Sequence, residues 1–481
     1  MKQTKTYYDF FKELSTIPRA SGNEQGIQNY LLNFAKERNL QVCKEDESGN
    51  IIIKKPATKG YEHISPVILQ SHMDMVAEKS PESPHNFDTD PIELIEEGGF
   101  LHANQTTLGA DNGIGVAYSL ALLFDDTIEH PALEAIFTTE EETTMKGAEL
   151  LKSESLSGTY MLNLDSEEEG VFCVSSAGGL DFIGKLPLRY VTSMQDTTYK
   201  LVVSDLKGGH SGMNINSGRE NANKLLARLL NRIAKALPDM ELVSIDGGSK
   251  MNAIPRDAHA RFNLSKKDES TLHKMVELMQ TEVRNELQPT DKVSLYLETS
   301  DFVSEVMEKQ NRDDIISFLV LVPNGVNTMS KNIHGLVESS QNLGIVTTEE
   351  NEIGFYISAR SSVDSLLELI CERNLTLSKL CKVDMLTGRG YPAWEYKADS
   401  PLRDLAIETY KTFFNKEPKL EAIHAGLECG YFAKKIPGID IISLGPNIYD
   451  VHSPKEKMQL DSADRMYDYV VALLKEMIRF S

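Results

Sequence analysis

The chain has 481 residues, more than one hydrophobic core ordinarily holds, so we expect two or three domains. Its formal net charge is −22 at pH 7, from 50 lysines and arginines against 72 acidic residues. That excess argues against nucleic acid or an anionic membrane surface as a partner. It favours cation binding wherever several carboxylates converge.

Cysteine usage and the N-terminus both indicate the cytoplasm. The five cysteines are odd in number and unclustered, as in reduced proteins without a disulfide frame or a cysteine-type zinc site. Residues 1–8 have no apolar run behind their lysines, unlike a signal peptide. No apolar stretch reaches the length of a membrane span. We therefore expect a cytoplasmic protein.

The N-terminal part of the chain predicts one helix followed by two strands. Residues 23–38 carry apolar side chains at helical spacing, with Asn23 as the N-cap. The apolar stripe consists of Ile27, Leu31, Phe34 and Ala35. Residues 41–43 and 50–54 read as strands on either side of a turn.

A short apolar run at residues 67–70 leads directly into His72 and Asp74. The run is too short for a helix and predicts a buried strand. In open α/β sheets, ligands bind outside the carboxyl ends of strands. A carboxylate can also hydrogen-bond the second nitrogen of a metal-binding imidazole. A single His-x-Asp can equally lie in an ordinary loop, so its meaning depends on the residues found at the ends of other strands.

Four later stretches repeat this design and place an acid or a histidine where a strand or loop meets the rim of the sheet. They carry Asp111, Glu140–Glu142, Asp165 and His452. The predicted strands before three of them cover residues 132–138, 160–164 and 439–444. An acidic triplet can also be a solvated surface. A glycine-rich helix entry, as at residues 107–117, can bind phosphate, but that loop would need a Gly-Lys-Ser/Thr that is absent here.

Two imidazoles and three carboxylates are the donor set that a pair of divalent cations needs, with one carboxylate bridging. Such cations lie about 3.5–4 Å apart and clamp a nucleophilic water. Nitrogen and oxygen ligands without thiolates favour Zn²⁺, Mn²⁺ or Co²⁺. Of two adjacent glutamates, one can bind metal while the other moves protons. The residues alone leave open whether Glu141 or Glu142 is the ligand.

Between residues 186 and 383 the chain changes character, and strands each precede an amphipathic helix. The strands are predicted over residues 198–203, 258–264 and 354–359, and the helices over 221–236, 269–286 and 364–374. This order indicates an inserted α+β domain. We expect a catalytic domain made of residues 1–185 and 384–481, interrupted by the insert and closed by a helix over 462–480.

Along essentially its whole length the chain resembles the M20 metallopeptidases, in the branch of aminoacyl-histidine dipeptidases, also called Xaa-His dipeptidases or bacterial carnosinases. The motifs that carry the resemblance lie at residues 71–76 (SHMDMV), 108–115 (LGADNGIG), 139–142 (TEEE), 163–165 (NLD), 208–212 (GGHSG), 335–340 (GLVESS), 424–430 (HAGLECG) and 451–453 (VHS). The resemblance implies a zinc-peptidase-like α/β catalytic domain, with a mixed central sheet flanked by helices. It also implies an inserted α+β lid that often mediates dimers, so a homodimer through the lid is expected.

The resemblance implies two divalent ions, Zn²⁺ in first place with Mn²⁺ or Co²⁺ as alternatives. It implies that Asp111 bridges the metals, that His72 and Glu142 belong to different metals and that Asp165 and His452 complete the set. The family places the ligand glutamate five residues before a glycine, and Gly147 therefore selects Glu142. The implied catalytic residues are Asp74, which orients His72, and Glu141, the general base and acid.

The resemblance also implies residues on the substrate side. His210 would polarise the scissile carbonyl, in its own subunit or in a partner. Asn252 and Arg360 match positions that hold the polar ends of the substrate, and His424 lies on a substrate-side loop. A Cys–His nucleophile pair of Cys429 and His424 is the rival that the residues alone leave open, because it depends on proximity in space.

The implied function is hydrolysis of unblocked dipeptides, preferentially Xaa-His including β-Ala-His, by a metal-bound hydroxide with a glutamate general base. The preference for histidine rests on the resemblance alone. One alternative is another M20-type amidohydrolase, such as a tripeptidase, carboxypeptidase or aminoacylase. A non-catalytic binding protein of the same fold would have lost ligands or the base, yet all six positions are present.

Overall fold

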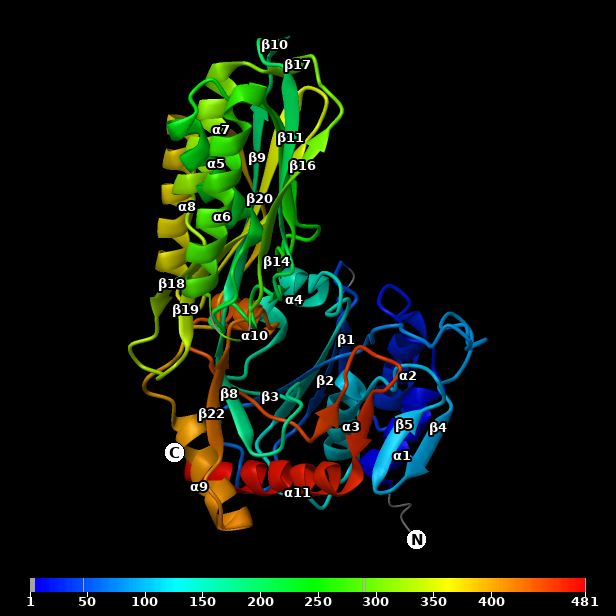
Figure 1. The fold of residues 1–481 in the computed structure, drawn as a ribbon. Helices are drawn as coiled ribbons and strands as arrows, with labels where there is room; N and C mark the ends of the chain where they lie inside the picture. Colours follow the sequence, from blue (N-terminus) through cyan, green and yellow to red (C-terminus); the bar gives the residue numbers. More distant parts are fainter. Residues whose placement is uncertain (1–4, 46, 288, 290, 481) are drawn as a thin grey trace. The chain divides into compact units, whose positions relative to one another are not determined.

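The computed structural model describes residues 5–45, 47–287, 289 and 291–480 of the chain (Figure 1). It divides into two compact units. Unit 1 comprises residues 1–175, 396–422 and 427–481, and unit 2 comprises residues 176–395 and 423–426. Of the N-terminal segment discussed above, residues 1–4 lie outside the described part.

An eight-stranded sheet forms the centre of unit 1, in the order β1-β2-β6-β3-β7-β23-β8-β22. Its strands are β1 (Gln41–Lys44), β2 (Ile51–Lys55), β3 (Val67–His72), β6 (Leu133–Thr138), β7 (Tyr160–Asn163), β8 (Val171–Ser176), β22 (Lys419–Ile423) and β23 (Asp440–Ser443). β6, β3, β7 and β23 pair in parallel, whereas β1, β2 and β6 pair antiparallel. The sheet is therefore mixed, as the resemblance implies.

The central strands are rich in apolar residues, which suits strands that helices cover. Every residue of β3 and β6 is buried, as expected for parallel strands packed on both faces. The surrounding helices are α1 (Tyr7–Ser15), α2 (Gln25–Glu37), α3 (Ala110–Phe124), α9 (Pro401–Phe414) and α11 (Leu460–Glu476), and one core joins them to the sheet (Figure 1). The short apolar runs of the sequence thus identified the buried strands correctly.

The predicted start of the first long helix needs a correction. The stripe Ile27–Ala35 is buried as predicted, but α2 begins at Gln25 with Glu24 at its N-cap and no side-chain cap bond. Asn23 is therefore not the cap. The Glu24 carboxylate instead accepts hydrogen bonds from the backbone N–H of Gly22 at 2.9 Å and of Glu140 at 3.2 Å. Contacts between distant segments have overridden the local capping preference.

A small four-stranded sheet, in the order β24-β25-β5-β4, completes unit 1. Its strands are β4 (Leu94–Glu97), β5 (Phe100–Ala103), β24 (Ile448–Tyr449) and β25 (Lys457–Gln459), and two short helices of this unit are α4 (Lys146–Leu150) and α10 (Cys429–Lys435). His452 lies in the turn that joins β24 to β25, which pair antiparallel. The small sheet therefore fixes the segment that carries this histidine.

Unit 2 is an antiparallel sheet of nine strands with helices on one face (Figure 1). The strand order is β16-β11-β15-β13-β19-β20-β9-β21, with β18 beside β19. The strands are β9 (Gly178–Pro187), β11 (Thr197–Ser204), β13 (Glu241–Gly247), β15 (Ala258–Leu264), β16 (Ser294–Ser300), β18 (Gly325–Met329), β19 (Val337–Thr348), β20 (Glu352–Ser361) and β21 (Asp384–Tyr391). The helices are α5 (Ala222–Ala236), α6 (Glu269–Glu286), α7 (Lys309–Leu321) and α8 (Asp364–Leu380), and they share a second core with the sheet. The predicted α+β organisation is confirmed.

The boundaries of the insert differ from the predicted ones. The predicted division after residue 185 falls inside β9, and the division after 383 falls just before β21. β21 pairs with β9, and β9 pairs with β20, so all three strands belong to the sheet of unit 2. The segment 423–426 also belongs to unit 2, because the backbone N–H of Ala177 donates to the carbonyls of Ile423 (3.1 Å) and Ala425 (3.0 Å).

Two absences were also expected. Among the described residues, no helix combines the length and the apolar character that a membrane crossing requires. The five cysteines, all of which the structure describes, are free thiols.

Candidate metal and catalytic site

Three neighbouring parallel strands of unit 1 deliver acidic side chains and a histidine to one edge of the sheet. β3 lies between β6 and β7 and ends at His72. Asp165 follows the end of β7, and Glu141 and Glu142 follow the end of β6. Because the carboxyl ends of parallel strands meet at one edge, segments far apart in sequence converge there.

Asp111 reaches this edge from the start of α3. The Glu456 carboxylate accepts hydrogen bonds from the backbone N–H groups of Leu108 (2.7 Å), Gly109 (2.9 Å) and Ala110 (2.8 Å). An anion at a helix N-terminus satisfies donors that have no partner within the helix. Regular helical backbone angles begin only after Asn112. Glu456 therefore fixes the irregular turn that presents Asp111.

The two oxygens of Asp111 face two different histidines. Oδ1 lies 3.0 Å from His72 Nε2, and Oδ2 lies 3.1 Å from His452 Nε2. A second acid accompanies each histidine. Asp165 Oδ1 lies 3.4 Å from His72 Nε2, and Glu142 Oε2 lies 3.0 Å from His452 Nε2.

These contacts define two groups of potential metal ligands that share Asp111. One group is His72, Asp111 and Asp165, and the other is Asp111, Glu142 and His452, with the ligand atoms of each group within 4.8 Å of one another. Glu142 Oε1 and Asp165 Oδ1 are buried and have no hydrogen-bond partner in the described part of the chain. Nitrogen and oxygen donors with unsatisfied buried oxygens fit a pair of divalent cations.

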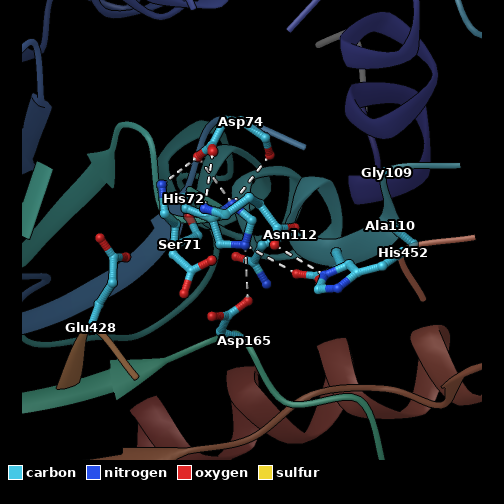
Figure 2. A network of polar contacts seen from close by, with 12 residues as sticks. Ser71, His72, Asp74, Gly109, Ala110, Asn112, Asp165, Glu428 and His452 are labelled. Carbon is cyan, nitrogen blue, oxygen red and sulfur yellow. Dashed lines mark hydrogen bonds and ion pairs between the residues drawn. The ribbon is translucent and has the colours of Figure 1, made fainter. Parts of the chain in front are cut away.

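Asp74 contacts both His72 and the backbone of the acidic triplet. Its carboxylate accepts hydrogen bonds from the backbone N–H of Glu141 (3.1 Å), the backbone N–H of Glu142 (3.2 Å) and the Ser21 hydroxyl (2.7 Å). His72 Nδ1 lies 3.4 Å from Asp74 Oδ1 and 3.1 Å from the Asp74 carbonyl (Figure 2). With Nδ1–H facing these acceptors, the Nε2 lone pair is left for a metal.

The electrostatics of the site reflect an excess of carboxylates in a buried space. Burial raises the pKa of Asp165 to about 7 and holds the pKa of Glu141 well above its usual range. Burial alone would lower the pKa of His72, but the carboxylates of Asp165 and Asp111 outweigh it and raise that pKa well above normal. Hydrogen bonds to Asp111 and Glu142 raise the pKa of His452 to about 11. A bound cation would compensate this negative charge.

Two further buried residues support the site, and neither was predicted as a site residue, although Glu428 lies in the motif at residues 424–430. Arg19 donates from Nη1 to the carbonyls of Met73 and Asp74, both at 3.0 Å, and so holds the turn after β3. Glu428 accepts hydrogen bonds from Gln70 Nε2 and Thr138 Oγ1, both at 2.6 Å, and burial raises its pKa to about 8. Both residues act through contacts between distant segments.

The predicted substrate-side residues all lie in unit 2. His210 Nδ1 accepts hydrogen bonds from the backbone N–H of Gly212 and of Met213, each at 3.2 Å. Nε2 therefore carries the proton of the neutral ring, and it has no hydrogen-bond partner among the described residues. Burial, assisted by the charge of Arg360, lowers the pKa of His210. His210 is thus a neutral donor at Nε2.

Arg360 and His424 are buried close to each other, whereas the Asn252 side chain is exposed. Arg360 Nη1 donates to the Tyr391 hydroxyl at 2.6 Å, and His424 Nε2 lies 2.6 Å from Ser340 Oγ. Burial and the charge of Arg360 lower the pKa of His424 to about 4. His424 is therefore neutral at physiological pH.

The structure disfavours the rival Cys–His pair. Cys429 is fully buried in unit 1, and burial raises the pKa of its thiol well above the usual value. A cysteine nucleophile needs a lowered pKa. His424 has its own partner in Ser340.

A model of peptidase family M20/M25/M40 matches residues 68–476. The chain belongs to this family. It is 39% identical over 471 residues to the cytosol non-specific dipeptidase of Escherichia coli (strain K12), a match that covers 98% of this chain and 97% of that relative. The solved structure of aminoacylhistidine dipeptidase from Vibrio alginolyticus matches with a TM-score of 0.93 and 36% identity, covering 98% of this chain and 96% of the other. Aminopeptidase PepT from Bacillus cereus, at 16% identity and a TM-score of 0.56, shares the fold.

Membership of the M20 family confirms the predicted recognition, the fold class and the assignment as a peptide hydrolase. Both highly similar relatives match almost end to end. The similarity therefore includes unit 2 as well as unit 1.

Proposed function

We propose that this M20 peptidase is a two-metal dipeptidase that hydrolyses unblocked dipeptides, with Xaa-His dipeptides, including β-Ala-His, among the preferred substrates. The observation that carries the proposal is the sharing of Asp111 between two histidines, each accompanied by a second acid. The names of the two full-length relatives, a non-specific dipeptidase and an aminoacylhistidine dipeptidase, support the substrate class.

We assign five residues to the metal pair. His72 and Asp165 would hold one ion, Glu142 and His452 the other, and Asp111 would bridge them. Two bound divalent ions polarise a carbonyl oxygen and lower the pKa of water, which is the Lewis-acid chemistry that peptide hydrolysis needs. The absence of thiolates favours Zn²⁺, with Mn²⁺ or Co²⁺ as alternatives.

We assign proton transfer to Glu141. Its backbone N–H is anchored on Asp74, and its side chain lies with His72 and Glu142 in a third group of closely spaced donors. Glu141 takes a proton from the attacking water and gives it to the leaving amine. Asp74 is the residue that holds Glu141, Glu142 and His72 in their relative positions.

The residues of unit 2 suit the other groups of a dipeptide. A neutral Nε2–H on His210 can donate to the oxygen of the scissile carbonyl as negative charge develops there. A buried guanidinium at Arg360 can take the free carboxylate through a bidentate, charge-assisted contact. Asn252 and His424 are proposed as further polar contacts for the substrate.

Two other expectations remain proposals. A cytoplasmic location is supported by the name of the Escherichia coli relative. A homodimer through unit 2 is supported by the family resemblance. The net charge of −22 supports the expectation that neither nucleic acid nor a membrane is a partner.

The role of His210 can be tested by replacing it with alanine. We expect His210→Ala to lower kcat about 10²–10³-fold, the usual cost of losing one oxyanion donor. Metal content should not change, because His210 belongs to neither ligand group. The matched control is His259→Ala, which removes a partly exposed histidine of the same unit. Unchanged kcat in His210→Ala would place this residue outside the reaction.

A substrate panel tests the function itself. We expect faster hydrolysis of unblocked dipeptides than of tripeptides or N-acyl amino acids, since a dipeptide offers a free amine and a free carboxylate on either side of one peptide bond. Within the dipeptides, Xaa-His should be cleaved with higher kcat/KM than Xaa-Ala. Faster turnover of tripeptides or acylated amino acids than of any dipeptide would instead support another amidohydrolase of the family.

A further inference from the structure

Arg360 is a buried cation that is not salt-bridged to an acid in the described part of the chain. Its exposed fraction is 8%, and it makes no ion pair with any residue in the described ranges. Asp181 is the acid on which the charge of Arg360 acts. Burial raises the pKa of Asp181, and the hydrogen bond with Ser358 and the charge of Arg360 only partly offset that rise. A buried arginine is normally paired. The charge of Arg360 is therefore available to an anionic group from outside the protein.

The residue that does contact the Arg360 guanidinium is Tyr391. Arg360 Nη1 donates to the Tyr391 hydroxyl oxygen at 2.6 Å. The phenol is neutral, because burial raises its pKa. A hydroxyl oxygen can therefore fix the direction of the guanidinium without neutralising its charge.

Two glycines hold the Tyr391 ring in place. A Cβ added at Gly179 would lie 2.5 Å from the ring, and a Cβ added at Gly426 would lie 2.6 Å from it. Both approaches are closer than any side chain permits, so the ring packs directly against two stretches of backbone. Gly426 belongs to the short segment 423–426 of unit 2, so this contact adds to the hydrogen bonds from Ala177 that hold the segment there. The hydroxyl of Tyr391 is therefore rigidly placed.

Two histidines near Arg360 are neutral as well. The charge of Arg360 lowers the pKa of both His424 and His210, so both rings lie near it and remain uncharged. His424 is held by Ser340 at 2.6 Å. Apart from Asp181, which forms no ion pair with Arg360 in the described part of the chain, these neighbours orient the guanidinium and carry no negative charge.

We propose that Tyr391 is a positioning residue that fixes the Arg360 guanidinium for the C-terminal carboxylate of the substrate. The inference rests on the proposed function in one respect, namely that Arg360 receives this carboxylate. Without the Tyr391 hydroxyl, the guanidinium keeps its charge but loses a fixed direction, and a bidentate contact depends on direction.

The test is Tyr391→Phe, which keeps the ring between the two glycines and removes only the hydroxyl. KM and kcat are measured for β-Ala-His and for its C-terminal amide. We expect KM for the free acid to rise about tenfold, the effect of losing one hydrogen bond to a charged group, with little change in kcat. KM for the amide should stay unchanged. Thermal unfolding and metal content serve as checks on folding.

Two further variants complete the design. Tyr356→Phe is the matched control, because this tyrosine lies on β20 with Arg360 and its hydroxyl makes no hydrogen bond among the described residues; it should change neither KM. In Arg360→Met, KM for the acid should rise towards that of the amide, and adding Tyr391→Phe should then have no further effect.

The outcomes separate the inference from the proposed function. If Arg360→Met raises KM for the acid but not for the amide, and Tyr391→Phe raises neither, the positioning role fails and the proposed function stands. If Tyr391→Phe raises both KM values equally, Tyr391 has only a structural role. If Arg360→Met leaves KM for the acid unchanged while dipeptides are still hydrolysed, the carboxylate site lies elsewhere and the inference is overturned. Failure of the proposed function itself would appear in the substrate panel, as faster turnover of tripeptides or acylated amino acids than of any dipeptide.

Discussion

Removal of divalent ions with EDTA is expected to abolish dipeptide hydrolysis, and added Zn²⁺, Mn²⁺ or Co²⁺ to restore it. Five potential ligands converge at one edge of the unit 1 sheet, and two of their buried oxygens have no hydrogen-bond partner among the described residues. A protein that buries so many carboxylates without enough cations of its own needs bound ions to compensate their charge. Metal analysis of the isolated protein should find about two divalent ions per chain.

Ligand variants sharpen this expectation. Asp111→Ala should lose both ions, because Asp111 belongs to both ligand groups, whereas His72→Ala should weaken chiefly the ion shared with Asp165. The control is His63→Ala, which removes an exposed histidine of the same unit. Metal content and hydrolysis are measured on the same preparations. Full activity in a sample verified to be free of metal would contradict the two-metal mechanism.

The elements that carry the site could be predicted because they are locally encoded. Runs of apolar residues such as 67–70 are too short for a helix, and the structure buries β3 and β6 completely. Polar residues directly after such runs reach the sheet edge through topology alone. The sequence therefore allowed the strand-end positions of His72 and Asp165 to be predicted, and also the helix that follows Asp111.

The features that could not be predicted depend on contacts between distant segments. The Asp74 carboxylate holds the backbone of Glu141 and Glu142, and Glu456 binds the turn before Asp111. Nothing near either acid in sequence reveals its partner. The same limit explains the shifted domain boundaries. β9 and β21 lie near opposite ends of the unit 2 sequence, yet they pair with each other. It also explains the false cap at Asn23.

The different roles of Glu141 and Glu142 are expected to appear in two substitutions, one affecting turnover and the other metal binding. Glu141→Gln should keep the metals and lower kcat about 10²–10⁴-fold, the usual contribution of general acid–base catalysis. Glu142→Gln should instead lower metal occupancy. Glu142 Oε2 lies 3.0 Å from His452 Nε2, and its other oxygen is buried without a hydrogen-bond partner among the described residues. Glu141 has no such contact with His452.

Glu140→Gln is the matched control for both variants. Glu140 forms an ion pair with Lys146 at 3.0 Å and belongs to none of the three donor groups. Its substitution should leave metal content and kcat nearly unchanged. The local backbone should survive in all three variants, because Asp74 and Glu24 bind main-chain N–H groups of the triplet. If Glu141→Gln loses metal while Glu142→Gln retains it but turns over slowly, the register within the triplet is reversed, and Glu142 is the proton carrier.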